Sequence, residues 1–248
     1  MTYVKRRPGA PPGFFVCEAA GLRWLADADG ARVVRVRAVG DDELVLERLV
    51  PAPATPSAAD ELGRGLARTH AAGAEAFGVT PSGWDGDGFF GPLDDPYPLP
   101  AGRFARWGEF YAACRVDQLR RLLAGTGFDD RLARLSGRLA DGAYDDGVGP
   151  ARVHGDLWSG NVMWTRAGAV LIDPAAHGGH PITDLAMLAL FGAPHLERVV
   201  AAYDEAAPLP DGWRDVVGLH QVYPVGMHVV LFGGGYAAQL DALLRRYA

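Results

Sequence analysis

The first 50 residues alternate between short apolar runs and turn-forming residues. Apolar side chains recur at helical spacing from Phe14 to Leu25, which predicts an amphipathic helix. Other apolar runs predict strands at Thr2–Lys5, Ala31–Val39 and Leu44–Leu49. The proline-rich segment 50–57 then breaks the pattern. We therefore expect a small strand-rich N-terminal lobe at residues 1–50, followed by a connecting segment.

From residue 51 to residue 248 the apolar spacing is mostly helical. The helices predicted from it cover residues 57–72, 104–123, 129–139, 181–190, 195–206 and 212–247. Gly233, Gly234 and Gly235 predict a break within the last of these. Residues 78–103 are rich in Gly, Pro, Asp and aromatic residues, which predicts a long ordered surface loop, and such loops often border binding sites. The predicted fold is α+β, with a larger helical lobe at residues 51–248.

Three polar residues in the segment 151–185 stand out against apolar surroundings: Asp156, Asn161 and Asp173. Asp156 follows a short apolar run and begins a loop that reaches Asn161. Strand-like runs at 162–165 and 169–172, joined by a turn, then lead to Asp173. Because a hairpin returns its second strand alongside the first, we expect Asp173 to lie beside Asn161.

That arrangement suits phosphoryl transfer. One carboxylate takes the proton of the attacking hydroxyl, while an amide and a second carboxylate hold magnesium against the nucleotide phosphates. Each residue alone also has a structural explanation, because Asp156 could cap a helix, Asn161 could lie in a turn and Asp173 could end a strand. The combined spacing, HxD-x4-N followed by a hairpin Asp, favours the catalytic interpretation.

Composition narrows the class of protein. The chain has 248 residues, of which 49% are hydrophobic and 22% charged, and a net charge of −6, which is unlike a nucleic-acid-binding surface. Cys17 and Cys114 are too few for a disulfide framework or a zinc site. No signal peptide opens the chain, and residues 222–240 resemble a buried helix more than a membrane span. We expect a soluble, cytoplasmic protein that binds neither nucleic acid nor membranes.

Lysine usage points to one further candidate. Of the 24 Lys and Arg residues, only Lys5 is a lysine. A compact ammonium on a flexible stem suits contact with phosphates in a tight space better than a guanidinium does. Lys5 is therefore a candidate phosphate-binding residue, and the alternative is a surface lysine present by chance.

Several short sequences resemble the fructosamine kinase (ketosamine kinase) family, which has a protein-kinase-like, two-lobe fold and belongs to the aminoglycoside phosphotransferase-like superfamily. They are HGDLWSGN at 154–161, IDPA at 172–175, GGH at 178–180, DLAML at 184–188, LFG at 190–192 and LFGGGY at 231–236. HGD-x4-N is shared with aminoglycoside and choline kinases, whereas LWSG together with Pro174-Ala175 is more specific to fructosamine kinases. The resemblance extends from Lys5 to the C-terminus.

The resemblance implies roles for the residues of the central segment. Asp156 is implied to be the catalytic base that orients the sugar hydroxyl. Asn161 and Asp173 are implied to bind magnesium. Trp158 and His228 are the candidate substrate contacts, His228 because it lies beside the FGGGY sequence.

The resemblance also implies a nucleotide site in the N-terminal lobe. Lys5 is implied to contact the ATP phosphates, and Glu18 to hold Lys5 in place. Glu47, Arg48 and Leu49 are implied to form the hinge, whose main chain meets the adenine. In kinases of this type a nucleotide-covering loop and two strands precede the lysine, so we expect the N-terminal lobe to be truncated here.

The family transfers the γ-phosphate of ATP to the 3-hydroxyl of a ketosamine, after which the adduct is unstable and frees the amine. The resemblance thus implies deglycation, with ATP and Mg²⁺ as cofactors and small ketosamines or glycated lysines on proteins as partners. A second interpretation is a kinase of the same fold for aminoglycosides or choline-like alcohols, and acidic loop residues keep it open: Asp85, Asp87, Asp94 and Asp95. A third is a truncated, catalytically silent kinase-like binding module.

Overall fold

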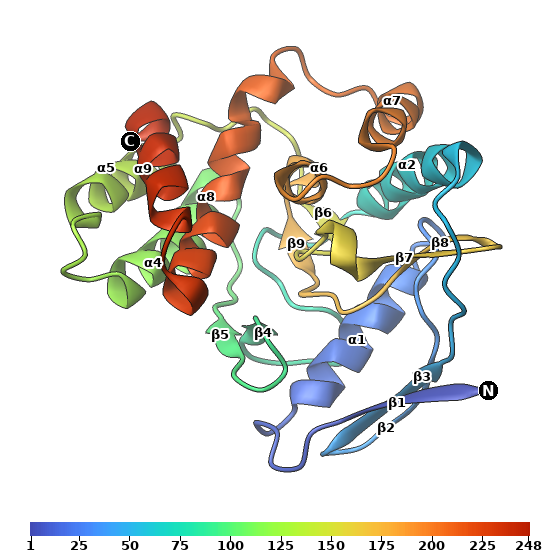
Figure 1. Cartoon of the computed structure of the whole chain (residues 1–248). Coiled ribbons are helices and arrows are strands. Elements are labelled where there is room, and N and C mark those ends of the chain that lie inside the picture. Colours follow the sequence, from blue (N-terminus) through green and yellow to red (C-terminus); the bar gives the residue numbers. More distant parts are fainter.

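A computed structural model describes residues 1–248 (Figure 1). Its N-terminal part is an antiparallel sheet in the order β1-β3-β2, formed by β1 (Thr2–Arg6), β2 (Val36–Val39) and β3 (Glu43–Glu47). In this sheet Lys5 pairs with Leu44, whose side chain is buried. Helix α1 (Phe14–Ala26) follows β1 and packs against β2 and β3.

Helix α1 begins where its sequence allows a sharp change of direction. Gly13 precedes the helix with a φ of 78°, a left-handed conformation that glycine adopts without a steric penalty. A Cβ atom at Gly13 would also collide with the indole ring of Trp84. The inner face of the helix buries Phe15 and Leu25 completely, and each such side chain stabilises the fold by about 1.5–3 kcal/mol.

The remainder of the chain is mostly helical. Its helices are α2 (Pro56–Ala71), α3 (Trp107–Tyr111), α4 (Asp117–Leu122), α5 (Asp129–Ala140), α6 (Pro181–Leu190), α7 (Leu196–Ala206), α8 (Trp213–Phe232) and α9 (Tyr236–Tyr247). A π-helical turn (Ala112–Val116) joins α3 to α4. Short antiparallel ladders pair β4 (Gly88–Phe90) with β5 (Tyr97–Leu99), β6 (Ala151–Val153) with β9 (His177–Gly179), and β7 (Val162–Thr165) with β8 (Gly168–Leu171). No helix is both long enough and apolar enough to cross a membrane.

Buried apolar residues form two cores. The first joins α1 and β3 to α2, α6, α7 and the β7–β8 hairpin, and the second joins the β4–β5 hairpin to the helices from α3 to α5 and to α8 and α9. In Figure 1 the helices of the second core lie on the side opposite α2 and α7. The first core contains buried residues from both sides of position 50, and the lobe boundary expected there stays a prediction.

The structure confirms several predicted elements and corrects others. The helix from Phe14 is present, and the last helical stretch breaks at the glycines between α8 and α9. The loop expected at 78–103 was wrong in its middle, because Phe90 and Leu99 are buried in the second core as parts of the β4–β5 hairpin.

Two predicted boundaries were also wrong. The strand expected from Ala31 begins only at Val36, because Val33 bridges to Leu171 of β8 and the Val34 N–H donates to the Leu171 carbonyl oxygen at 3.0 Å. Residues before β2 thus join the N-terminal sheet to the β7–β8 hairpin. The helix expected from Phe104 starts at residue 107 and changes to a π-helical turn at residue 112.

Candidate active site

The loop between β6 and β7 carries Asp156 and Asn161. Gly155 precedes Asp156 with a φ of 80°, and a Cβ atom there would collide with the carbonyl oxygen of Ala175, so the position requires glycine. A 3-10 turn over Ser159–Asn161 ends the loop. The Asn161 Nδ2 amide donates to the main-chain oxygen of Asp156 at 2.8 Å and to its Oδ2 atom at 3.1 Å.

The β7–β8 hairpin returns Asp173 to this loop. Val162 pairs with Leu171, and the N–H of Ile172 donates to the carbonyl oxygen of Asn161 at 3.0 Å. Asp173 therefore lies beside Asn161, as predicted, with Asn161 Nδ2 3.4 Å from the Asp173 carbonyl oxygen. Asp173 has a φ of 53°, in the left-handed region that Asp tolerates better than most residues.

Lys5 connects the N-terminal sheet to these residues. Its Nζ atom lies 2.8 Å from Glu18 Oε2 on α1 and 3.2 Å from Asp173 Oδ1. Lys5 and Asp173 are 168 positions apart in the sequence, and the fold brings the side chain of Lys5 on β1 into contact with Asp173, which follows β8. The structure thus places Lys5, Glu18, Asp156, Asn161 and Asp173 in one cluster.

Burial and mutual charge shift the pKa values within this cluster. Burial raises the pKa of Asp156 to about 7, an effect that the hydrogen bond from Asn161 partly offsets. Burial also raises the pKa of Glu18, against the attraction of Lys5. Burial alone would lower the pKa of Lys5, but Glu18 and Asp173 more than compensate, and the net pKa is raised. Lys5 is therefore held as an ammonium between two carboxyl groups.

A buried network beneath the loop fixes its main chain. Asp184 of α6 is completely buried and accepts hydrogen bonds from the N–H groups of His154 at 2.7 Å and Gly155 at 2.9 Å. His70 of α2 places Nε2 3.1 Å from Asp184 and Nδ1 2.9 Å from the Tyr203 hydroxyl. Burial raises the pKa of Asp184, but these hydrogen bonds outweigh it and the net pKa is lowered. The sequence analysis did not identify His70. The only sequence signal for it was the position of a histidine in the last turn of an amphipathic helix.

The cluster lies in a cleft of about 550 Å³. The cleft is bounded by α1, the β4–β5 hairpin, the loop between β6 and β7 and the facing ends of α8 and α9. Trp158 and His228, the candidate substrate contacts, both line it, and their contact with a substrate stays a prediction. The Trp158 ring, 40% exposed, meets Phe191 edge-on at 6.0 Å, and His228 lies 4.9 Å from Tyr236. The cleft thus combines the polar cluster with several aromatic rings.

Comparison with known proteins assigns the family. The family model described as fructosamine kinase matches residues 2–248. The chain belongs to the fructosamine kinase family. It is 37% identical over 241 residues to "Probable ketoamine kinase TTHA1179" of Thermus thermophilus, in an alignment that covers 96% of this chain and 84% of that protein.

Solved structures agree with this membership. The crystal structure named "putative fructosamine-3-kinase" from Thermobifida fusca has a TM-score of 0.89 and 43% identity, covering 99% of this chain and 85% of that one. Macrolide 2'-phosphotransferase MphH from Brachybacterium faecium has a TM-score of 0.56 and 18% identity, covering 99% and 84%, which shows the fold alone. The fold is therefore α+β and protein-kinase-like with two lobes, and this member of the family is a phosphotransferase that phosphorylates a hydroxyl group.

The three residues expected to form the hinge lie apart from the cleft. Glu47, Arg48 and Leu49 do not line it, and Leu49 packs against the first core. The carboxylate of Glu47 faces arginines of the neighbouring chain segment, with Arg32 at 3.6 Å. The N–H of Leu49 has no acceptor within the protein. Their contact with adenine stays a prediction.

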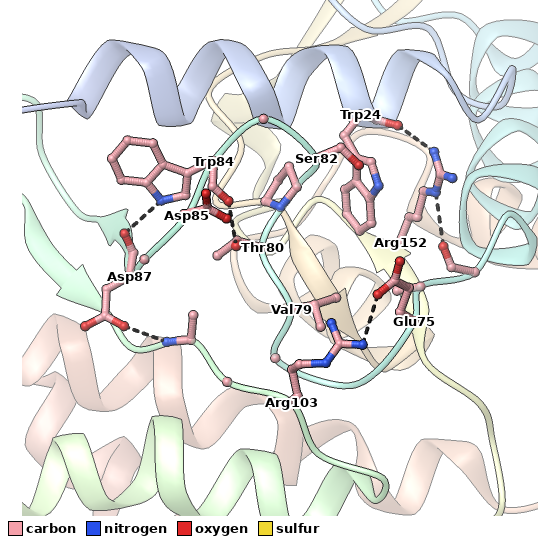
Figure 2. A pocket seen from close by; sticks show the side chains of 18 of the residues that line it. Trp24, Glu75, Val79, Thr80, Ser82, Trp84, Asp85, Asp87, Arg103 and Arg152 are labelled. Atoms are coloured by element: carbon pink, nitrogen blue, oxygen red, sulfur yellow. Dashed lines mark hydrogen bonds and ion pairs between the residues drawn. The ribbon is translucent and has the colours of Figure 1, made fainter.

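A second cavity of about 800 Å³ is lined by segment 78–87 (Figure 2). None of the candidate catalytic residues lines it. Arg152 is already engaged there, donating to the carbonyl oxygens of Gly73 at 3.0 Å and Trp24 at 2.9 Å near the C-terminal ends of α2 and α1. Glu75 is paired with Arg103 at 2.9 Å. Thr80 lines both cavities.

The polar cluster fits a divalent cation bound together with phosphates. Two carboxyl groups, from Glu18 and Asp173, contact the ammonium of Lys5, and the carboxyl group of Asp156 lines the same cleft. The Oε1 atom of Glu18 is buried without a partner. Magnesium is typically bound by one or two protein carboxylates, and phosphate oxygens and water complete its shell. Asn161 and Asp173 supply one amide and one carboxylate, which suit a magnesium site whose other ligands are phosphate oxygens and water. A site built from protein ligands alone is not present, because no group of three His, Cys, Asp or Glu residues could hold a metal ion.

Proposed function

We propose that this protein transfers the γ-phosphate of ATP to the 3-hydroxyl of a ketosamine and so takes part in removing sugar from glycated amines. The observation that carries the proposal is the convergence of Lys5 on both Glu18 and Asp173 in the cleft that Asp156 also lines. Because the reaction depends on ATP, we also propose a cytoplasmic location.

Each residue of the cluster has a role that its position supports. Asp156 accepts the proton of the acceptor hydroxyl and orients that hydroxyl for attack, a contribution of about 10²–10⁴-fold in rate. Lys5 binds phosphate oxygens through its ammonium, which Glu18 holds at 2.8 Å. Asn161 and Asp173 would hold Mg²⁺, which supplies neutralisation of the phosphate charge when bound.

The rest of the cleft suits the sugar and amine parts of the acceptor. Its lining includes aromatic rings that can stack against a sugar or an alkyl amine, among them Trp158, Phe191 and Phe232. Phe232 at the rim is 65% exposed, so the cleft is accessible to a group attached to something larger. We therefore propose small ketosamines, or glycated lysines on the surfaces of proteins, as acceptors.

The positions of the acidic loop residues argue against a polycationic aminoglycoside as acceptor. Asp85 and Asp87 line the second cavity (Figure 2), and Asp94 and Asp95 line neither cavity. The carboxylates that do line the cleft belong to the catalytic cluster. Several ammonium groups would thus find no spare counter-charge beside the reacting hydroxyl.

A panel of acceptors tests the proposal. Purified protein would be incubated with Mg·ATP and a fructosyl amine, a ribulosyl amine or an aminoglycoside, and phosphorylation followed by phosphorus NMR. We expect phosphate at the 3-hydroxyl of one or both ketosamines and none on the aminoglycoside. Phosphorylation of the aminoglycoside alone would contradict the assignment.

Binding of nucleotide separates the kinase from a silent binding module. A ligand that binds only the folded state raises its apparent stability, so Mg·ATP at 100 times its Kd adds about 2.7 kcal/mol. We expect a clear rise in Tm with Mg·ATP and a smaller rise for Asp173→Asn. If the Tm does not respond to Mg·ATP and no acceptor is phosphorylated, the chain is a silent module.

A further inference from the structure

The β4–β5 hairpin spans both cores of the molecule. Side chains of neighbouring residues in β4 point in opposite directions, as in any strand. Phe89 packs against the first core and Phe90 is buried in the second. Leu93 of the hairpin turn also packs against the first core, whereas Leu99 of β5 lies in the second. Figure 1 shows the hairpin between α1 and the helices of the second core.

The base of the hairpin is held by several hydrogen bonds. Asp87 accepts from the N–H of Ala101 at 2.9 Å across the two strands, and the Asp87 carbonyl oxygen accepts from the indole of Trp84 at 3.0 Å (Figure 2). Two residues of the helical part also donate to this region. Gln118 donates to the carbonyl oxygen of Pro98 at 2.6 Å, and Arg115 donates to that of Pro100 at 2.8 Å. The base is therefore fixed to the helical part of the chain.

The turn of the hairpin, residues 91–96, has one hydrogen bond to the rest of the protein. Arg7 donates through Nη2 to the carbonyl oxygen of Asp94 at 2.8 Å. The Nη1 atom of the same guanidinium is shielded from solvent and has no partner. Because the Asp94 carboxylate takes no part, the contact depends on Arg7 and on the main chain of the turn.

Arg7 also continues the strand that carries Lys5. Its N–H donates to the carbonyl oxygen of Asp42 at 2.9 Å, extending the pairing of β1 with β3 by one residue. Gly91, Pro92 and Leu93 of the turn line the cleft together with Lys5. The strand that holds the phosphate-binding lysine therefore also fixes one wall of the acceptor cleft.

We propose that Arg7 is a positioning residue for the acceptor: by holding the turn of the β4–β5 hairpin against the N-terminal sheet, it sets the width of the cleft that receives the ketosamine. The acceptor part of this proposal rests on the proposed function. Loss of Arg7 should weaken binding of the acceptor and leave nucleotide binding nearly unchanged, because Lys5 keeps its own contacts with Glu18 and Asp173.

Amide hydrogen exchange tests the contact without any substrate. The variants are Arg7→Ala, Arg7→Lys, which can still donate one hydrogen bond, and the control Arg6→Ala, whose exposed side chain pairs with Glu43 on the sheet. We expect exchange at residues 88–99 to be about tenfold faster in Arg7→Ala, intermediate in Arg7→Lys and unchanged in Arg6→Ala. Equal exchange in Arg7→Ala and Arg6→Ala would overturn the proposal.

Kinetics test the role in acceptor binding. For Arg7→Ala we expect the KM for the ketosamine to rise about tenfold, with the KM for ATP and kcat within about threefold of the parent and partial recovery in Arg7→Lys. A rise in the KM for ATP alone would contradict an acceptor-positioning role. So would a fall in kcat of about tenfold with both KM values unchanged. If the parent protein phosphorylates no ketosamine, the proposed function fails and the acceptor role of Arg7 fails with it, whereas the exchange result still decides the contact.

Discussion

At the scale of single residues, Asp156 combines a half-buried carboxylate with an amide donor at 3.1 Å. Burial raises its pKa to about 7, so in the folded state the ionised form is less favoured than in water. An acid whose pKa is raised on folding reduces stability as the pH rises from its unfolded pKa to its folded pKa. The ionised carboxylate of Asp156 thus lowers the stability of the folded state above neutral pH, and its role in proton transfer is the proposal made above.

Asp156→Asn should separate these two effects. We expect kcat to fall by about 10²–10⁴-fold, since general-base contributions are of that size. The Tm at pH 8 should be equal to or above that of the parent, because the substitution removes a carboxylate whose ionisation burial disfavours. Steady-state kinetics and thermal melts measure the two outcomes, and a variant with unchanged turnover would show that Asp156 is structural.

Lys5 depends on the compact geometry of an ammonium. Its Nζ atom lies within 3.2 Å of both Glu18 and Asp173, a space that a planar guanidinium fills differently. For Lys5→Arg we expect kcat/KM to fall at least tenfold, with little change in Tm. Arg6→Lys is the matched control, because its side chain is exposed and should tolerate the exchange. Parent-like turnover in Lys5→Arg would contradict the phosphate role.

At the scale of elements, the loop between β6 and β7 relies on a glycine that no other residue can replace easily. Gly155 has both a left-handed φ and a close neighbour in the carbonyl oxygen of Ala175. Gly147 has a similar φ of 78°, but nothing lies within 4 Å of its Cβ position. The two positions therefore differ in crowding and share the same backbone constraint.

Comparison of Gly155→Ala with Gly147→Ala isolates that crowding. We expect Gly147→Ala to lower the free energy of unfolding by about 1–2 kcal/mol through the left-handed backbone alone. Gly155→Ala should cost more, because the added methyl group displaces main chain that Asp184 holds, and activity should fall with it. Chemical denaturation and turnover are the measurements, and equal losses in the two variants would argue against the collision.

Local sequence signals were enough for some elements and insufficient for others. The hairpin that returns Asp173 to Asn161 was predictable, because its turn and its two apolar runs are contiguous in the sequence. The short β4–β5 pair was missed, since Phe90 and Leu99 reveal their burial only through contacts with distant helices. His70 was missed for the same reason, because its partner Asp184 is 114 positions away.

At the scale of the whole molecule, several histidines are buried and neutral. Burial, followed by the charge of Arg115, lowers the pKa of His177 to about 3. Burial, followed by His180, lowers the pKa of His220 well below its usual value. In the unfolded chain these groups take up protons near pH 6.5, so their contribution to stability is lost as the pH falls below that value.

His220→Phe should therefore flatten the dependence of stability on pH. Between pH 7.5 and pH 5 we expect the free energy of unfolding of the parent to fall faster than that of the variant, by up to about 1.4 kcal/mol per pH unit. His195→Asn is the control, because His195 is exposed and its left-handed φ of 56° suits Asn. Comparing variants is necessary because Asp156 and Glu18, with raised pKa values, act in the opposite direction.

The bridge between Val33 and Leu171 makes the first 50 residues hard to detach. That bridge and the shared first core connect α1 and β3 to strands encoded more than a hundred positions later. A fragment beginning at residue 51 would expose the apolar residues of the first core to solvent, so we expect it to aggregate instead of folding. If the chain is divided at the connecting segment, we expect neither part to fold on its own. In the intact chain the two parts should unfold in a single cooperative transition.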